Sequence, residues 1–249
     1  MALEDYASAL VTGASSGIGA AVVRRLRGRG LAVHAMARRR QRLDALAEET
    51  GCVAHVLDVR DTSRTFEVIS DLDADIVVNN AGLGRGFGKL HEARLEDIDA
   101  TIDTNVRAAI HVLRASLPGM LSRNRGHVVN MSSVAGLYPL ASPVYGASKS
   151  AVHQLSRNLR LELAGSRLRL TEICPGRVST EFFDAAIDDP DKRAAVKETG
   201  INELTADDIA DAVLYALDAP WRVNVSLIEL QPTEQVFGGM NLVPVGQER

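Results

Sequence analysis

Short apolar runs alternate with amphipathic segments along nearly the whole chain of 249 residues. The apolar runs are rich in β-branched residues and are flanked by turn residues, as is typical of strands. Seven strands are predicted, at residues 8–13, 31–37, 52–59, 75–82, 126–133, 168–176 and 223–230. The segments between them have helical spacing, and helices are predicted at residues 18–27, 40–49, 63–72, 95–121, 145–163 and 206–217.

Strands that are apolar throughout and alternate with helices indicate a parallel sheet covered on both faces. We therefore predict an α/β fold of the Rossmann type, with a doubly wound parallel sheet of about seven strands. No linker, repeat or low-complexity stretch interrupts the pattern, so residues 1–249 are expected to form a single domain. The one irregular stretch, residues 179–204, is polar and contains Pro190. A long segment between a strand and a helix of such a fold is usually a functional lid.

Composition and charge narrow the class of protein. Hydrophobic residues make up 46% of the chain and charged residues 24%, which is ordinary for a globular protein with a large core. The net charge of −4 gives no sign of a nucleic-acid surface. Cys52 and Cys174 are isolated and the six histidines lack ligand spacing, so neither a disulfide nor a metal site is expected. With no leader-like start and no apolar run near ~18 residues, we expect a cytoplasmic protein without membrane or nucleic-acid partners.

The first predicted strand runs directly into TGASSGIG, residues 12–19, and then into a helix. Gly13 permits a tight turn, Gly17 lets the backbone approach a pyrophosphate, and Gly19 lets the helix pack against the strand. The helix N-terminus adds unpaired N–H groups and the positive end of the helix dipole. A plain glycine turn is the alternative, but the position at the first strand–helix junction favours a dinucleotide-binding loop.

The end of the second predicted strand bears on the choice of cofactor. In NAD-binding proteins an acidic residue at this place accepts a hydrogen bond from the ribose 2′-hydroxyl. Here Ala37 stands 18 residues after Gly19, and Arg38, Arg39 and Arg40 follow it. A small neutral residue followed by guanidinium groups suits a 2′-phosphate. NADP is therefore predicted in preference to NAD; the alternative is that the arginines only begin a solvated helix face.

Tyr145 and Lys149 are four residues apart in a predicted helix, so their side chains share one face. A nearby ammonium favours the phenolate, and it would lower the pKa of the tyrosine from its usual ~10 towards neutral pH. The pair is therefore predicted to donate and accept a proton. A chance spacing on an amphipathic helix is the alternative, and the pair alone does not exclude it.

Seven motifs, taken together, resemble a classical short-chain dehydrogenase/reductase. They follow the family's order: TGASSGIG (12–19), DV (58–59), NNAG (79–82), Asn105 in a long helix, SSVAG (132–136), YGASK (145–149) and PGRVST (175–180). The ending IELQPTEQ (228–235) resembles the branch that contains serine or 3-hydroxy acid dehydrogenases and clavulanic acid dehydrogenase. The resemblance implies an NADP-dependent oxidoreductase that interconverts a carbonyl, in an aldehyde or ketone, and an alcohol by hydride transfer.

The resemblance also implies a role for each motif residue. Tyr145 would be the general acid/base, Lys149 would bind the nicotinamide ribose and keep the phenol acidic, and Ser133 would polarise the carbonyl. Asn105 would hold a helix carbonyl and a water that relays protons through the lysine. The cofactor contacts are expected at Gly13, Ser15, Ser16, Gly17, Ile18, Gly19, Arg38, Arg39, Asp58, Val59, Asn80, Ala81, Gly82, Tyr145, Lys149, Pro175, Gly176, Val178 and Thr180.

Two neighbouring serines, Ser132 and Ser133, are candidates for the catalytic hydroxyl. The Ser-x-Ala-Gly pattern selects Ser133, which lies 12 residues before Tyr145, one fewer than the family usually has. Ser132 would restore the usual spacing. Because the intervening PLASP is a loop, and loops lose residues readily, Ser133 is predicted. The missing residue falls in the pocket wall around residues 140–144.

The substrate is not fixed by these motifs. The pocket is expected to be lined by Leu83, Gly84, Arg85, Ser142, Pro143, Val144, Phe182 and the lid. Arg85 could bind an anionic group of the substrate or could simply be solvated. The rival functions are an NAD-dependent dehydrogenase of the same fold, a non-catalytic dinucleotide-binding regulatory protein, and an epimerase or dehydratase. The last class resembles longer chains with a different glycine spacing.

The predicted helices at residues 95–121 and 145–163 carry more apolar residues than one core-facing stripe needs. In proteins that this chain resembles, these helices form a four-helix interface between subunits. A homo-oligomer is therefore expected, specifically a homotetramer; the alternative is that both helices are buried within one chain.

Overall fold

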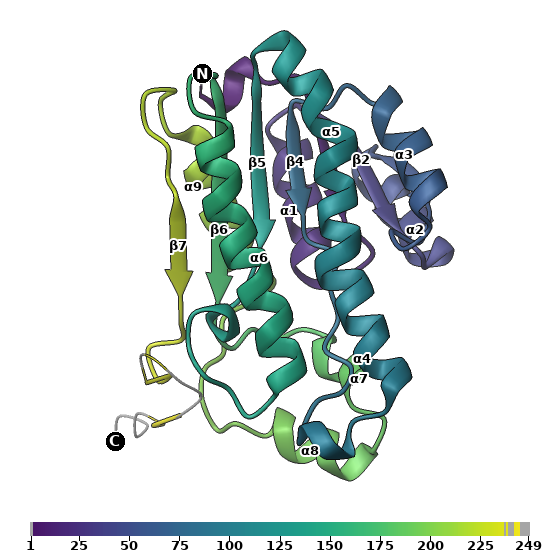
Figure 1. Ribbon diagram of the computed structural model, residues 1–249, viewed down its shortest axis with the longest axis vertical. Helices are drawn as coiled ribbons and strands as arrows, with labels where there is room; N and C mark the ends of the chain where they lie inside the picture. The colour runs from purple at the N-terminus through teal and green to yellow at the C-terminus, as the bar shows by residue number, and fades with distance from the viewer. Residues whose placement is uncertain (1, 237, 239–241, 245–249) are drawn as a thin grey trace.

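The computed structural model describes residues 2–236, 238 and 242–244. Its seven strands are all parallel and form one sheet in the order β3-β2-β1-β4-β5-β6-β7 (Figure 1). The strands are β1 (Ser8–Thr12), β2 (Ala32–Ala37), β3 (Val53–Val56), β4 (Ile76–Asn79), β5 (Gly126–Met131), β6 (Leu168–Pro175) and β7 (Leu227–Leu230). The predicted doubly wound parallel sheet is confirmed. The strand order reverses beside β1 and β4, which is where such sheets bind ligands.

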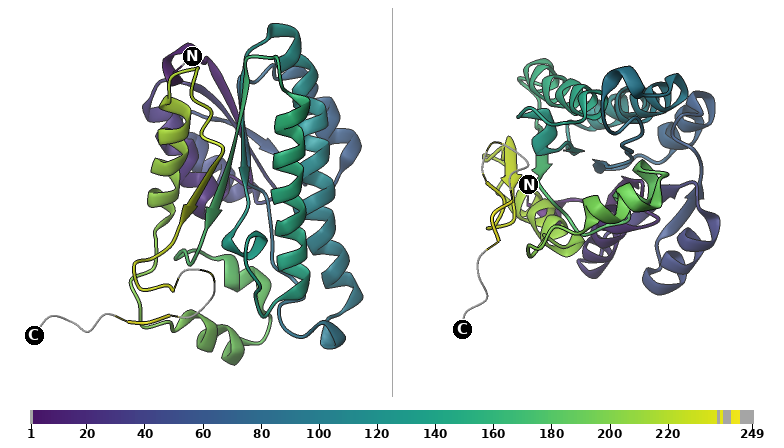
Figure 2. Two further views of the ribbon diagram at one scale, coloured as in Figure 1. Left: turned by 60° about the vertical axis from the view of Figure 1, so that its left-hand side comes forward. Right: turned by 90° about the horizontal axis from the view of Figure 1, so that it is seen from below.

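Helices cover both faces of the sheet (Figures 1 and 2). One face packs on α1 (Gly17–Gly28), α2 (Arg40–Thr50) and α9 (Ala206–Asp218), and the other on α3 (Thr62–Asp71), α5 (Ala109–Arg123) and α6 (Pro143–Glu162). Alternate residues of each central strand enter the two cores: Ala9 and Val11 belong to one, and Leu10 belongs to the other. Both faces are therefore apolar, which explains why the strands read as continuous hydrophobic runs.

The long helix expected at residues 95–121 is divided in the structure. It consists of α4 (Leu95–Ile102), a π-helical segment (Asp103–Ala108) and α5. A π-helical turn inside an α-helix is often found at functional sites, and this one contains Asn105. The expected strand at residues 223–230 begins only at Leu227.

The irregular stretch at residues 179–204 contains two short helices that the sequence did not predict, α7 (Phe182–Ala186) and α8 (Pro190–Lys197). In α8 the proline stands in the first helical turn, and the Asp189 carboxylate accepts backbone hydrogen bonds from Asp191 and Lys192. Both helices lie beyond the carboxyl ends of β5 and β6 (Figure 1). This segment therefore covers the edge of the sheet where ligands bind, and we call residues 179–204 the lid.

Among the described residues, no helix combines the length and apolar character that crossing a membrane requires. The same residues contain no cluster of three or more His, Cys, Asp or Glu side chains arranged to hold a metal ion.

Candidate active site

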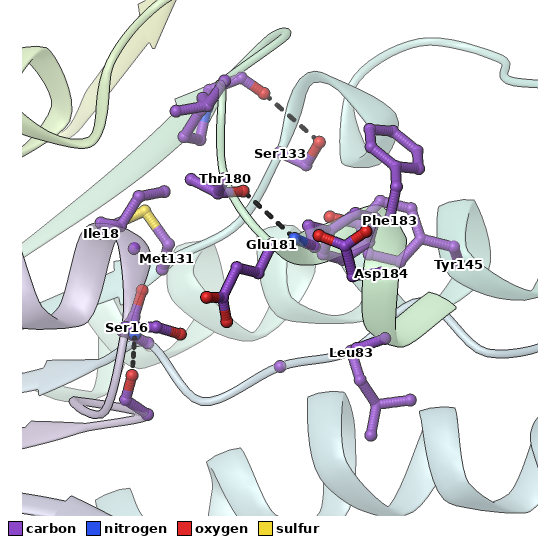
Figure 3. Close-up of a pocket in the computed structure, with 18 of the residues that line it drawn as sticks. Ser16, Ile18, Leu83, Met131, Ser133, Tyr145, Thr180, Glu181, Phe183 and Asp184 are labelled. Carbon is purple, nitrogen blue, oxygen red and sulfur yellow. Dashed lines mark hydrogen bonds between the residues drawn. The ribbon is translucent and has the colours of Figure 1, made fainter. Parts of the chain in front are cut away.

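A cavity of about 1100 Å³ lies along the carboxyl ends of the strands, between the sheet and the lid (Figure 3). Most of the residues that the sequence assigned to cofactor and catalysis line it: Gly13, Ser15, Ser16, Gly17, Ile18, Arg38, Arg39, Asp58, Val59, Asn80, Ala81, Gly82, Ser133, Tyr145, Lys149, Pro175, Gly176, Val178 and Thr180. Gly19 and Asn105 lie outside this lining and contact residues that belong to it. The structure thus brings segments from residue 13 to residue 180 together at one edge of the sheet.

The glycine-rich loop between β1 and α1 has a backbone that favours glycine. Gly13 and Gly17 have positive φ angles of 68° and 52°. Gly19 packs so closely on the loop that a Cβ atom there would lie 2.5 Å from the carbonyl oxygen of Gly13. The side chain of Asn80 donates a hydrogen bond of 2.9 Å to the carbonyl of Thr12, which ties the end of β4 to this loop. Because α1 begins at Gly17, its unpaired N–H groups lie at the cavity and can bind phosphate.

The arginines after β2 do not all point the same way. Arg38 is exposed and its guanidinium lies 3.8 Å from the Asp58 carboxylate. Arg39 instead reaches the glycine-rich loop, where it donates a 3.0 Å hydrogen bond to the Ser15 hydroxyl and a second one to the Ser16 hydroxyl. Ala37 is buried at the end of β2 and places no carboxylate there. The guanidinium closest to the loop is therefore that of Arg39.

Two residues at this end of the cavity, Arg42 and Glu181, were not among the predicted cofactor contacts, although Glu181 lies in the lid that was expected to line the pocket. The Glu181 carboxylate accepts a 3.0 Å hydrogen bond from Arg39 and bonds of 2.6 and 2.5 Å from Arg42. These hydrogen bonds lower the pKa of the Glu181 carboxyl, and the bonds from Arg42 have the larger effect. Arg42 lies three residues after Arg39, and this helical spacing predicts that the two side chains are neighbours. Glu181 is far from both arginines in the sequence, and nothing beyond its position next to Thr180 indicated that it would contact them.

The two candidate serines face different partners. The Ser133 hydroxyl donates a 3.3 Å hydrogen bond to the carbonyl of Pro175 and accepts one of 3.1 Å from the backbone N–H of Ala135. The Ser132 hydroxyl instead donates a 3.2 Å hydrogen bond to the backbone carbonyl of Lys149. Ser132 thus holds the backbone of α6, while Ser133 is the serine that interacts with the side chain of Tyr145 and lowers its pKa.

The prediction that Lys149 lowers the pKa of Tyr145 is wrong for this arrangement of side chains. Burial raises the pKa of Tyr145 to about 12, and its interaction with the Ser133 hydroxyl only partly offsets this effect. The Lys149 ammonium lies 5.8 Å from the centroid of the tyrosine ring and donates a 2.9 Å hydrogen bond to the carbonyl of Met131. Its own pKa is lowered to about 8 by burial, more than nearby Cys174 and Glu172 raise it. Desolvation is therefore the largest effect on the pKa of both groups.

Replacing Lys149 with methionine is expected to change how stability depends on pH. The folded chain releases this proton near pH 8 and the unfolded chain near 10.5, so wild-type stability should rise between these values as pH increases. The variant should lack this rise, and it should be more stable than wild type at pH 7 by up to about 3 kcal/mol. Urea unfolding at pH 7, 8, 9 and 10 measures the difference, with Lys192→Met on the exposed α8 as the control. Parallel pH profiles for wild type and Lys149→Met would contradict this prediction.

Asn105 links the π-helical segment to the chain after β4. Its side chain accepts a 2.8 Å hydrogen bond from the backbone N–H of Leu83 and donates bonds of 2.8 and 2.9 Å to the Leu83 carbonyl and the Ser148 hydroxyl. A Cβ atom on Gly82 would lie 3.2 Å from the Asn105 side-chain oxygen and 3.5 Å from the Lys149 ammonium. The two polar groups therefore meet at Gly82 on the cavity wall.

The chain after β6 leads from Pro175, beside the Ser133 hydroxyl, to the lid. A Cβ atom on Gly176 would lie 2.4 Å from the side-chain oxygen of Gln235, which accepts a 2.8 Å hydrogen bond from the backbone of Arg177. Val178 forms a parallel bridge with Leu204 at the far end of the lid. These contacts fix the segment that lines the cavity opposite the glycine-rich loop.

Aromatic side chains pack over Tyr145. The ring of Phe182 lies 5.2 Å from that of Tyr145 and 5.2 Å from that of Phe183, which in turn lies 5.8 Å from Phe87. Phe87 was not predicted, whereas Phe183 belongs to the lid that was expected to line the pocket. The hydroxyl of Ser142 is buried in this region and has no hydrogen-bond partner among the residues that the structure describes. The space beside the tyrosine is thus mainly apolar, with hydroxyl groups at its edge.

The predicted pocket residues are only partly correct. Leu83, Ser142 and Phe182 line the cavity, but Gly84, Arg85, Pro143 and Val144 do not. The guanidinium of Arg85 forms a 2.6 Å ion pair with Asp188 of the lid and lies 3.9 Å from Asp97. The structure therefore gives no support to a role for Arg85 as an anchor for an anionic substrate.

Comparison with known proteins gives a consistent result. Residues 7–191 match the family model described as short chain dehydrogenase. The chain is 41% identical over 242 residues to an NADP-dependent 3-hydroxy acid dehydrogenase, YdfG, of Salmonella typhi, covering 94% of this chain and 98% of that protein. The corresponding protein of Escherichia coli strain K12 is 40% identical over 242 residues, with the same coverage.

Solved structures that resemble this chain indicate the same family. The closed form of a serine dehydrogenase complexed with NADP+ has a TM-score of 0.89 and 39% identity, covering 94% of this chain and 98% of that one. Serine dehydrogenase from Escherichia coli has a TM-score of 0.80 and 37% identity, covering 92% of this chain and 100% of that one. The chain belongs to the short-chain dehydrogenase family.

Proposed function

We propose that this protein is an NADP-dependent oxidoreductase that interconverts an aldehyde or ketone and the corresponding alcohol, as a single domain over residues 1–249. The observation that carries the proposal is the convergence of Ser133, Tyr145 and Lys149 on one cavity that continues to the glycine-rich loop and Arg39. Hydroxyl groups at one end and an anion-binding loop at the other suit a carbonyl compound and a dinucleotide.

The residues present fit a 2′-phosphorylated dinucleotide. The helix N-terminus at Gly17 can receive a pyrophosphate, and Ala37 leaves no carboxylate to repel a 2′-phosphate. The guanidinium groups of Arg39 and Arg42 already hold one anion, the Glu181 carboxylate. The relatives named as NADP-dependent support the same choice.

The side chains of this protein supply the acid–base chemistry. When bound, the nicotinamide supplies or accepts the hydride at the reacting carbon. The hydroxyl groups of Ser133 and Tyr145 donate hydrogen bonds to the carbonyl oxygen and stabilise the negative charge that develops on it. Because the pKa of Tyr145 is about 12, its hydroxyl is protonated at neutral pH and can donate a proton to the product alkoxide. The ammonium of Lys149 adds positive charge beside the site.

A panel of aldehydes, ketones and 3-hydroxy acids tests the proposal, with oxidation of NADPH or reduction of NADP+ as the readout. The relatives' names make 3-hydroxy acids the first compounds to try. Turnover that consumes one nicotinamide per product supports the proposal. Tight NADP binding without turnover of any compound would favour a regulatory protein. A nicotinamide that stays bound and is regenerated within each cycle would favour an epimerase or dehydratase.

We also propose that the chain forms a homotetramer through its helices. Large apolar side chains are exposed on α4, α5 and α6: Leu95, Ile102, Ile110, Leu121 and Leu161. Covering such residues in a subunit interface removes apolar surface from water. Sedimentation velocity at micromolar concentration should give about four times the 26.7 kDa of one chain. A monomer under these conditions would contradict the proposal.

A further inference from the structure

One side chain of the lid, Glu181, forms ion pairs with residues at the cofactor end of the cavity. Its carboxylate lies between the guanidinium groups of Arg39 and Arg42. Arg39 is the residue before α2, and Arg42 lies in the first turn of that helix. Figure 3 shows Glu181 reaching from the lid side of the cavity towards Ser16. The contact therefore joins the lid to the part of the cavity expected to receive the cofactor ribose.

Arg39 and Arg42 form an anion-binding site, and the Glu181 carboxylate occupies it. Arg39 and Arg42 carry two positive charges, and Glu181 supplies one negative charge. All three side chains are 46–47% exposed, so a competing anion can reach the guanidinium groups. A phosphate monoester carries about −1.5 to −2 charges at pH 7 and binds arginine with geometry similar to a carboxylate. The phosphate would compete with the Glu181 carboxylate for the same guanidinium N–H donors, and the two negative groups would repel each other.

We propose that Glu181 is a specificity-determining residue that competes with the 2′-phosphate of NADP for Arg39 and Arg42. The inference rests on the proposed NADP dependence. In this account the 2′-phosphate displaces the Glu181 carboxylate from the two guanidinium groups, whereas NAD, which lacks the phosphate, leaves their contact intact. Glu181 therefore opposes binding of the phosphorylated cofactor and lowers the preference for NADP over NAD.

The test measures binding of two nucleotides by calorimetry, 2′,5′-ADP and ADP, which differ only in the 2′-phosphate. Glu181→Gln should tighten 2′,5′-ADP about five-fold, as expected for the loss of an exposed ion-pair network, and should change ADP less than twofold. The control is Asp188→Asn, which breaks an ion pair that the lid forms with Arg85, outside the cavity. This control should leave both affinities unchanged, because it loosens the lid without freeing the arginines.

The outcomes separate this inference from the function on which it rests. If wild type binds 2′,5′-ADP no better than ADP, the proposed NADP dependence fails. If wild type prefers 2′,5′-ADP but Glu181→Gln leaves that affinity unchanged or weakens it, NADP dependence stands and competition by Glu181 is overturned.

Discussion

Tyr145→Phe is expected to lower kcat by a factor of about 10²–10⁴, because a positioned general acid or base contributes on that scale. The affinity for NADP should change less than twofold, since the variant loses only a hydroxyl and keeps the ring that packs on Phe182. Steady-state kinetics with the best compound of the substrate panel measures the first effect, and calorimetric titration with NADP+ measures the second.

Tyr215→Phe on the exposed face of α9 is the matched control and should leave both quantities unchanged. Loss of NADP affinity in Tyr145→Phe would mean that the tyrosine acts mainly in cofactor binding. Retention of more than about a tenth of the wild-type kcat would mean that another group transfers the proton.

Wild type is expected to favour NADPH over NADH by roughly ten- to hundred-fold in kcat/KM. A hydrogen bond between charged groups contributes about 1.5–3 kcal/mol, and ~1.4 kcal/mol corresponds to a factor of ten. The double change Ala37→Asp with Arg39→Leu should reverse the preference, because it adds an acceptor for the 2′-hydroxyl and removes the guanidinium at the glycine-rich loop. Both cofactors are compared with one common substrate.

Arg38→Leu is the matched control for this exchange. Arg38 is exposed and faces Asp58 rather than the loop serines, so its loss should change the preference less than threefold. A preference of wild type for NADH would mean that the arginines only begin a solvated helix. A large effect of Arg38→Leu would instead assign the 2′-phosphate to Arg38.

Much of the fold could be predicted because its causes are local. Apolar strands buried on both faces, glycine turns and amphipathic helices leave clear patterns in the sequence. The glycine-rich loop and the Tyr145–Lys149 pair could be recognised for the same reason, since each lies within one short segment. The π-helical turn at Asn105 could not, because a one-residue change in the hydrogen-bond ladder leaves the apolar spacing almost unaltered.

Features that depend on contacts between residues far apart in the chain could not be predicted from the sequence. Arg42 and Glu181 are 139 residues apart in the chain and meet only because the lid folds back over the cavity. Two lid helices were missed because they are short, and α8 buries none of its residues. The raised pKa of Tyr145 depends on burial beneath neighbouring segments, which the spacing to Lys149 does not report.

Hydride is expected to pass directly between NADPH and a carbonyl carbon in this cavity. NADPH carrying deuterium at C4 tests this, prepared separately in each of its two stereochemical forms and used with a carbonyl compound that the panel identifies. One form should transfer its deuterium to carbon, so that the alcohol gains one mass unit and keeps it in ordinary water. Unlabelled alcohol from both forms, despite oxidation of the cofactor, would contradict direct hydride transfer.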